Sequence, residues 1–164
     1  MNLARAIHLD ESDMNVYPTP ARSGEWLISG GFEFSNWSEA DLVGKARQAF
    51  ANGWLGLESF GRASFAAVAR IEPAEYEALI GTLADHFVAV YGAPDPAAAR
   101  PVAEEELAHM TALCEGQPAN TLLTVSRSLT EAGVREEFRL ISPADARLEQ
   151  IAVHAAPATG KGQP

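Results

Sequence analysis

Hydrophobic and polar positions alternate along this chain with two periods, and each period predicts one kind of element. The clearest period of two runs through residues 25–34, where aromatic and apolar side chains take every second position. This predicts a strand, with a bulge or a crossing backbone at the Gly30-Gly31 pair. Further strands are predicted at 3–9, 15–17 and 63–71, and a hairpin from 121–128 and 134–141. The run at 63–71 is dense in apolar residues, which favours a central strand.

A spacing of three and four predicts a first helix over residues 39–51. Ser38 is a suitable N-cap, and Asp41 stands three residues later, where a capping box has its acidic member. Gly53 lies just past the last apolar position and predicts the end of the helix.

Proline and glycine delimit the next two helices. Pro73 is expected at the first helical position, and Gly92 ends the periodic segment that follows it. A third helix is predicted to start at Asp95-Pro96, to be broken or restarted at Arg100-Pro101, and to continue over residues 102–115.

Strands therefore stand at both ends of the chain, with the helices between them. This order differs from the strict alternation of a doubly wound parallel fold. We expect one α+β domain over residues 1–155, with a largely antiparallel sheet and about three helices packed on one face. Residues 147–155 fit either a last strand or a short helix, and residues 156–164 are expected to be a disordered tail.

Charge and composition exclude several classes of protein. The 164 residues carry a formal net charge of −10 without a basic stripe, so nucleic acid and anionic lipid are not expected partners. No apolar run reaches the roughly 20 residues of a membrane span, and the first ten residues lack the apolar stretch of a signal peptide. A single cysteine excludes an internal disulfide, which fits a cytoplasmic protein.

Motifs with known chemistry are missing from the sequence. There is neither a phosphate-binding glycine loop nor a nucleophile elbow. Glu106 and His109 share a helix face at the spacing found in di-iron bundles, but no second half-site surrounds His86. We interpret residues 104–106 as a solvated acidic turn near a helix start, and predict neither metal nor cofactor.

The connector over residues 48–71 is the most unusual segment, because it combines glycines, two large aromatics and two opposite charges. In a functional interpretation Trp54 and Phe60 wall a pocket or partner groove, Arg62 grips an anion, and Glu58 orients it or acts as a base. In a structural interpretation the apolar side chains fill the space between helix and sheet, and Glu58 pairs with Arg62.

Three strings, LARAIHLD at 3–10, GKARQAF at 44–50 and GWLGLESFGRASF at 53–65, resemble an uncharacterised bacterial family known only as a domain of unknown function. The resemblance extends to about residue 141. It implies a bacterial cytoplasmic protein, and it supplies no activity, cofactor or catalytic residue.

Two functions remain open. The first is a non-catalytic accessory or protein-interaction module that forms a homodimer or docks on a larger protein, since acid/base pairs, metal clusters and nucleotide loops are not recognisable. The alternative is a protein or enzyme that binds a small anionic metabolite, with Arg62 as anchor and Glu58 as acid/base.

Overall fold

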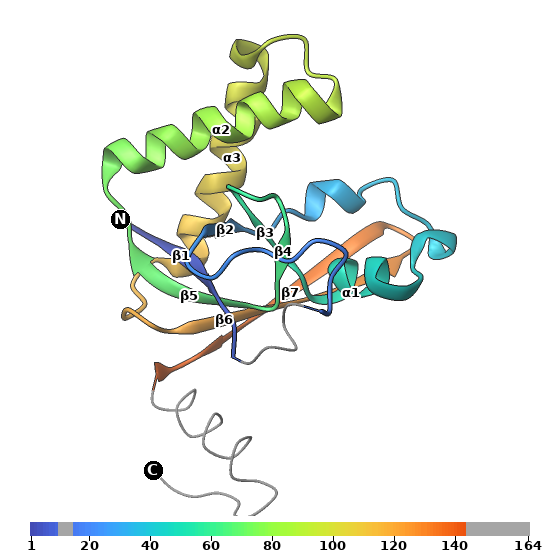
Figure 1. Ribbon diagram of the computed structural model, residues 1–164, viewed down its shortest axis with the longest axis horizontal. Helices are drawn as coiled ribbons and strands as arrows, with labels where there is room; N and C mark the ends of the chain where they lie inside the picture. The colour runs from blue at the N-terminus through green and yellow to red at the C-terminus, as the bar shows by residue number, and fades with distance from the viewer. Residues whose placement is uncertain (10–14, 144–164) are drawn as a thin grey trace, which may run out of the picture.

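The computed structural model describes residues 1–9 and 15–143, which form a curled antiparallel sheet and three α-helices (Figure 1). The described strands are β1 (Asn2–Ile7), β2 (Trp26–Ile28), β3 (Trp54–Gly56), β4 (Arg62–Ala63), β5 (Phe65–Arg70), β6 (Leu122–Thr130) and β7 (Gly133–Ile141). Their order across the sheet is β4-β3-β2-β1-β5-β6-β7. The predicted α+β class, the central position of the 63–71 strand and the final hairpin are confirmed.

The three helices contact the sheet in two separate places. They are α1 (Gly44–Asn52), α2 (Pro73–Tyr91) and α3 (Pro96–Cys114), and two short 3-10 turns, η2 (Gly31–Phe34) and η3 (Glu39–Asp41), precede α1. The α3 helix packs on β1 and β2, α2 lies across α3, and α1 packs against β6 (Figure 1).

The ends of α2 and α3 follow local rules. Pro73 occupies the first helical position, and Gly92 adopts the left-handed conformation (φ 77°) that ends α2. Asp95 caps α3 by accepting a hydrogen bond from the backbone of Ala98. The predicted break at Pro101 is wrong, because α3 continues through this proline, which lies inside the helix and removes about one backbone hydrogen bond.

The N-terminal half differs from the prediction in three places. The strand expected over 25–34 ends at Ile28, because Gly30 turns left-handed (φ 71°) before η2 begins. Residues 15–17 form turns and bends in place of a strand. The capping box at Ser38 is present but caps η3, because Gly44 has a positive φ of 56°, which a right-handed helix cannot continue through.

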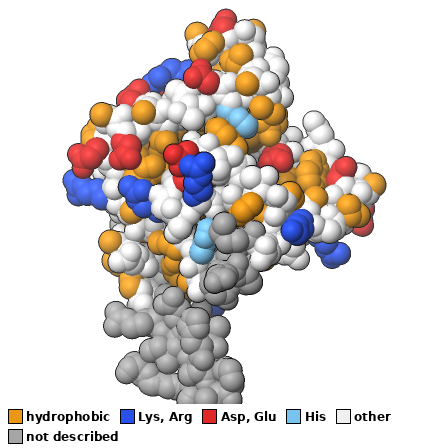
Figure 2. Space-filling model, viewed as in Figure 1, with side chains coloured by type: hydrophobic (Ala, Val, Ile, Leu, Met, Phe, Trp, Pro, Cys, Tyr) orange, Lys and Arg blue, Asp and Glu red, His pale blue; other side chains and the backbone are white. Residues whose placement is uncertain are grey.

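A stripe of small and apolar side chains on α3 forms much of the core against the sheet: Ala99, Ala103, Leu107, Met110 and Cys114. Burial raises the pKa of the Cys114 thiol to about 12, so this cysteine behaves as a small apolar core residue. Within residues 1–9 and 15–143, no helix has the length and apolarity of a membrane span. On the face shown in Figure 2, Lys and Arg side chains are dispersed among acidic ones.

The predictions for residues 147–155 and 156–164 lie outside the described residues.

Candidate functional site

The connector that the sequence singles out folds into β3, a tight turn and β4. Trp54 of β3 is 0% exposed. Its indole Nε1 donates to the carbonyl of Leu123 at 3.2 Å, and its ring stacks on Phe138 with centroids 5.7 Å apart. Trp54 therefore fills the core between β3 and the β6–β7 hairpin and is closed to solvent.

Arg62 of β4 is also buried, with 4% of its surface exposed. Its guanidinium donates to three backbone carbonyls and one carboxylate, those of Ser29, Gly30, Gly53 and Glu33, over 2.6 to 3.3 Å. Burial lowers the pKa of Arg62 to about 10, and the charge of Glu33 offsets part of that effect. The guanidinium of Arg62, which the sequence suggested as an anchor for an anionic ligand, is therefore already hydrogen-bonded to groups of its own chain.

Glu58 lies at the turn between β3 and β4, and its side chain points outward. It pairs with exposed Arg22 at 3.7 Å, so the predicted ion pair between Glu58 and Arg62 is wrong. The turn is organised by the buried carboxylate of Glu25, which accepts hydrogen bonds from the backbone N–H groups of Glu58 and Ser59 at 2.9 Å. A Cβ at position 56 would collide with that carboxylate, so the close approach of Glu25 explains why this position of the connector is a glycine.

Phe60 follows this turn in a left-handed conformation (φ 56°), and its ring stacks on His86 with centroids 3.8 Å apart. Trp54, Glu58, Phe60 and Arg62 therefore project in different directions, and none of them lines either cavity described below. Their joint assignment to a ligand or partner site stays a prediction.

A second buried arginine, Arg127 of β6, was not found from the sequence. Its guanidinium donates over 2.6 to 3.4 Å to one carboxylate, Glu136 of β7, and to four backbone carbonyls, those of Ala49, Phe50, Gly53 and Ser29. The α1 C-terminus and the end of β2 are thereby fixed against the hairpin.

The two arginines share two backbone acceptors, the carbonyls of Ser29 and Gly53. Both donate to the carbonyl of Ser29, and both guanidinium carbons lie near the Phe34 ring, at 4.6 and 5.1 Å from its centroid. The hydroxyl of Ser29 donates to Glu136 at 2.6 Å, so Ser29 and Glu136 are held in place together.

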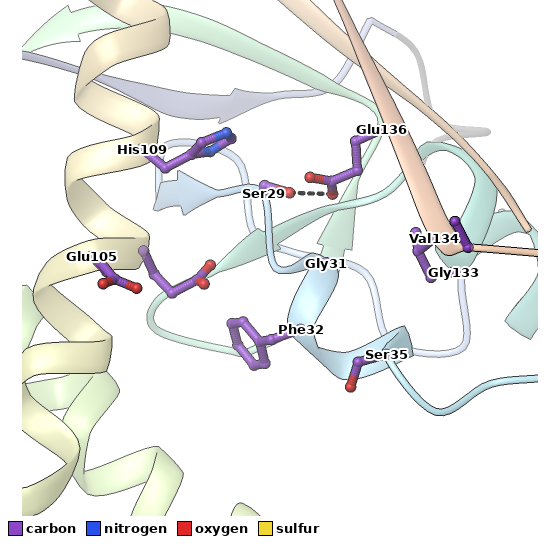
Figure 3. Close-up of a pocket in the computed structure, with 11 residues that line it drawn as sticks. Ser29, Gly31, Phe32, Ser35, Glu105, His109, Gly133, Val134 and Glu136 are labelled. Atoms are coloured by element: carbon purple, nitrogen blue, oxygen red, sulfur yellow. Dashed lines mark hydrogen bonds between the residues drawn. The ribbon is translucent and has the colours of Figure 1, made fainter. Parts of the chain in front are cut away.

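A cavity of about 600 Å³ opens beside this network (Figure 3). Its lining residues are Ser29, Gly31, Phe32, Ser35, Glu105, Glu106, His109, Ala132, Gly133, Val134 and Glu136. Figure 3 shows α3 at one wall and β7 at the other, with the segment from Ser29 to Ser35 between them. An adjoining cavity of about 570 Å³ shares Ser35, Gly133 and Val134 with the first, and its lining adds Glu39 and Glu131.

The lining of both cavities is acidic and contains neither Lys nor Arg. Arg127 neutralises Glu136 at 2.7 Å, but none of the ion pairs in the described part of the chain involves Glu105 or Glu106. Burial raises the pKa of Glu106, and the charges of Glu136 and Glu105 raise it further. A half-buried carboxylate with a perturbed pKa in a cleft is a candidate functional group.

Glu106 and His109, weighed from the sequence as metal ligands, both line this cavity. In the described ranges, 1–9 and 15–143, no group of three or more His, Cys, Asp or Glu residues could hold a metal ion. The interpretation of Glu106 as part of a solvated turn is wrong, because it lies within α3 and is only partly exposed. In the sequence, the sign of this partial burial was that Glu106 directly precedes Leu107, which is buried in the structure.

These features define a single-domain α+β protein with a curled antiparallel sheet, a buried arginine network and an adjacent acidic cavity. The chain belongs to a family of unknown function, DUF6505, whose family model matches residues 1–159. This agrees with the resemblance seen in the sequence. No curated protein and no solved structure shows significant similarity to this chain.

Proposed function

We propose that this chain binds a small organic cation, a protonated amine, in the cavity between α3 and β7. The observation that carries the proposal is Glu106: a partly buried carboxylate, without a basic partner among the described residues, whose pKa is raised by burial and by two neighbouring carboxylates. A positive charge placed in the cavity would stabilise the ionised form of Glu106 and relieve this repulsion.

The rest of the lining suits such a ligand. The hydroxyls of Ser29 and Ser35 can accept hydrogen bonds from an ammonium group, and Phe32 offers an aromatic ring for cation–π or apolar contact. An anionic ligand is disfavoured here, because the lining of this cavity holds the carboxylates of Glu105, Glu106 and Glu136 and neither Lys nor Arg.

Titration of the protein with a panel of alkylamines and with matched carboxylic acids tests this proposal. We expect amines to raise the melting temperature with increasing concentration and the acids to leave it unchanged. Near the raised pKa of Glu106, amine binding should also release protons, so calorimetric heats should differ between buffers of different ionisation enthalpy.

The matched variants are Glu106→Gln, which removes the lining charge, and Glu115→Gln, which removes an exposed charge outside the cavity. Glu106→Gln should abolish both the stabilisation and the proton release, whereas Glu115→Gln should retain them. A wild-type protein that responds to none of the amines would overturn the proposal.

A non-catalytic interaction module is the second candidate, and the exposed edge strand β7 favours it. An anionic ligand at Arg62 has weaker support, because that guanidinium would first have to give up Glu33 or a backbone carbonyl.

A further inference from the structure

We propose that two copies of this chain pair edge to edge through β7. This proposal rests on the interaction role above, and its test does not require amine binding. The β7 strand spans Gly133–Ile141 and ends the sheet, and none of the other described strands lies beyond it. Nine residues of strand offer an edge of roughly 30 Å. At the opposite end of the sheet, Pro20 forms a parallel bridge with Arg62 that covers part of β4.

Two of the devices that protect an edge strand, a bulge and a proline, are missing from β7, although the strand does carry charged side chains. It pairs with β6 without interruption from Gly133 to Ile141, so there is neither a bulge nor a proline within it. Leu140 is 40% exposed. A long, regular edge of this kind presents backbone donors and acceptors to another strand.

The exposed charges on β7 alternate in sign: Arg135, Glu137 and Arg139 project from the same face of the strand. A row of one sign would repel a second copy of the same strand. An alternating row instead complements its own antiparallel copy in a suitable register, and cross-strand pairs of opposite charge stabilise a sheet.

Two registers satisfy this condition for the exposed row, with the two-fold axis at Phe138 or at Glu136. A two-fold axis at Phe138 places Glu137 opposite Arg139 of the second copy, and the symmetry repeats this pair. An axis at Glu137 would oppose Glu137 to itself and Arg135 to Arg139. An axis at Glu136 would pair Arg135 with Glu137 of the second copy, but it would also oppose two Glu136 carboxylates. Like charges directly opposite are destabilising, so the geometry favours the axis at Phe138.

This register also connects the dimer to the cavity. Leu140 of the second copy would lie opposite Glu136, whose carboxylate lines the cavity wall. Directly opposed residues have Cβ atoms roughly 5 Å apart, so the second copy would extend that wall with an apolar side chain.

The test is the mass of the full-length protein in solution, measured by native mass spectrometry and by light scattering after size-exclusion chromatography. We expect the mass of two chains for the wild type. Glu137→Arg alone and Arg139→Glu alone should each give monomers, because each places like charges opposite one another. The combined Glu137→Arg/Arg139→Glu variant should restore the dimer, and Arg135→Ala should leave it intact.

A monomeric wild type would overturn the proposal, as would single variants that remain dimeric or a combined variant that stays monomeric. Circular dichroism of each variant checks that the sheet is retained. The amine titration can succeed or fail whatever the mass, so the two proposals are judged separately.

Discussion

Replacing Arg127 with methionine removes the guanidinium that joins β6 to α1, β2 and β7, while keeping an apolar stem of similar length. Each hydrogen bond to a charged group contributes about 1.5–3 kcal/mol, and five such bonds would sum to more than many domains possess in total. Partial rehydration of the carbonyls makes that sum an overestimate. Breaking a buried ion pair costs about 3–5 kcal/mol, which is the loss in free energy of unfolding that we expect.

Part of this loss arises from Glu136, which would be left partly buried without its counter-charge. Glu136→Gln removes that charge, so the double variant Arg127→Met/Glu136→Gln should be more stable than the sum of the single effects implies. A coupling of about 1–3 kcal/mol is expected for residues in one such network. Arg135→Met is the control, because its side chain is 66% exposed and surface changes usually stay within about 0.5 kcal/mol.

Urea unfolding followed by tryptophan fluorescence measures these free energies, since the core includes Trp54 and Trp26. A loss below about 1 kcal/mol for Arg127→Met would mean that the guanidinium contributes little. If the losses in the two single variants simply add in the double variant, the burial of Glu136 does not depend on Arg127. Either result would refute the account of the buried network given above.

Two further predictions concern the charge of Glu106 and the space around two glycines. The folded-state pKa of Glu106 lies above its ordinary value of 4.5, so its contribution to stability is present below pH 4.5 and is lost as pH rises through the raised pKa. Glu106→Gln should therefore raise the urea midpoint at pH 7 and leave it unchanged near pH 4. Glu115→Gln should leave the urea midpoint unchanged at both pH values. Gly61→Ala places a Cβ 2.5 Å from the carbonyl oxygen of Pro20 and should lower stability by about 1–3 kcal/mol. In the same denaturation assay Gly81→Ala, a helical position with open space around it, should raise stability by about 0.5–1 kcal/mol, and equal effects would contradict the steric argument.

The elements that the sequence predicts well are those whose ends depend on neighbouring residues. Pro73, Gly92 and Asp95 act within one turn of their own helix, so the boundaries of α2 and the start of α3 were predictable. The strand expected through Gly30 failed for a different reason. Its backbone turns where Leu55 and Arg62 approach, and that contact depends on the pairing of β2, β3 and β4.

The candidate site was hidden from sequence for the same reason. Ser29 and Glu136 are 107 residues apart and meet only when the sheet has curled. The connector attracted attention because its glycines and aromatics are distinctive, yet Glu25 explains Gly56, and core packing explains Trp54. Unusual local composition there reflects a crowded turn.

The shared use of the Ser29 carbonyl has a consequence for sequence variation within the family. A carbonyl oxygen has two lone pairs, and both are taken here by guanidinium groups that each reach several other acceptors. Lysine at position 62 or 127 would bring three donors from a single nitrogen and could not span the same set of carbonyls. Replacing either arginine therefore requires compensating substitutions among the residues that it contacts. We expect positions 62 and 127 to vary within the family only together with those residues.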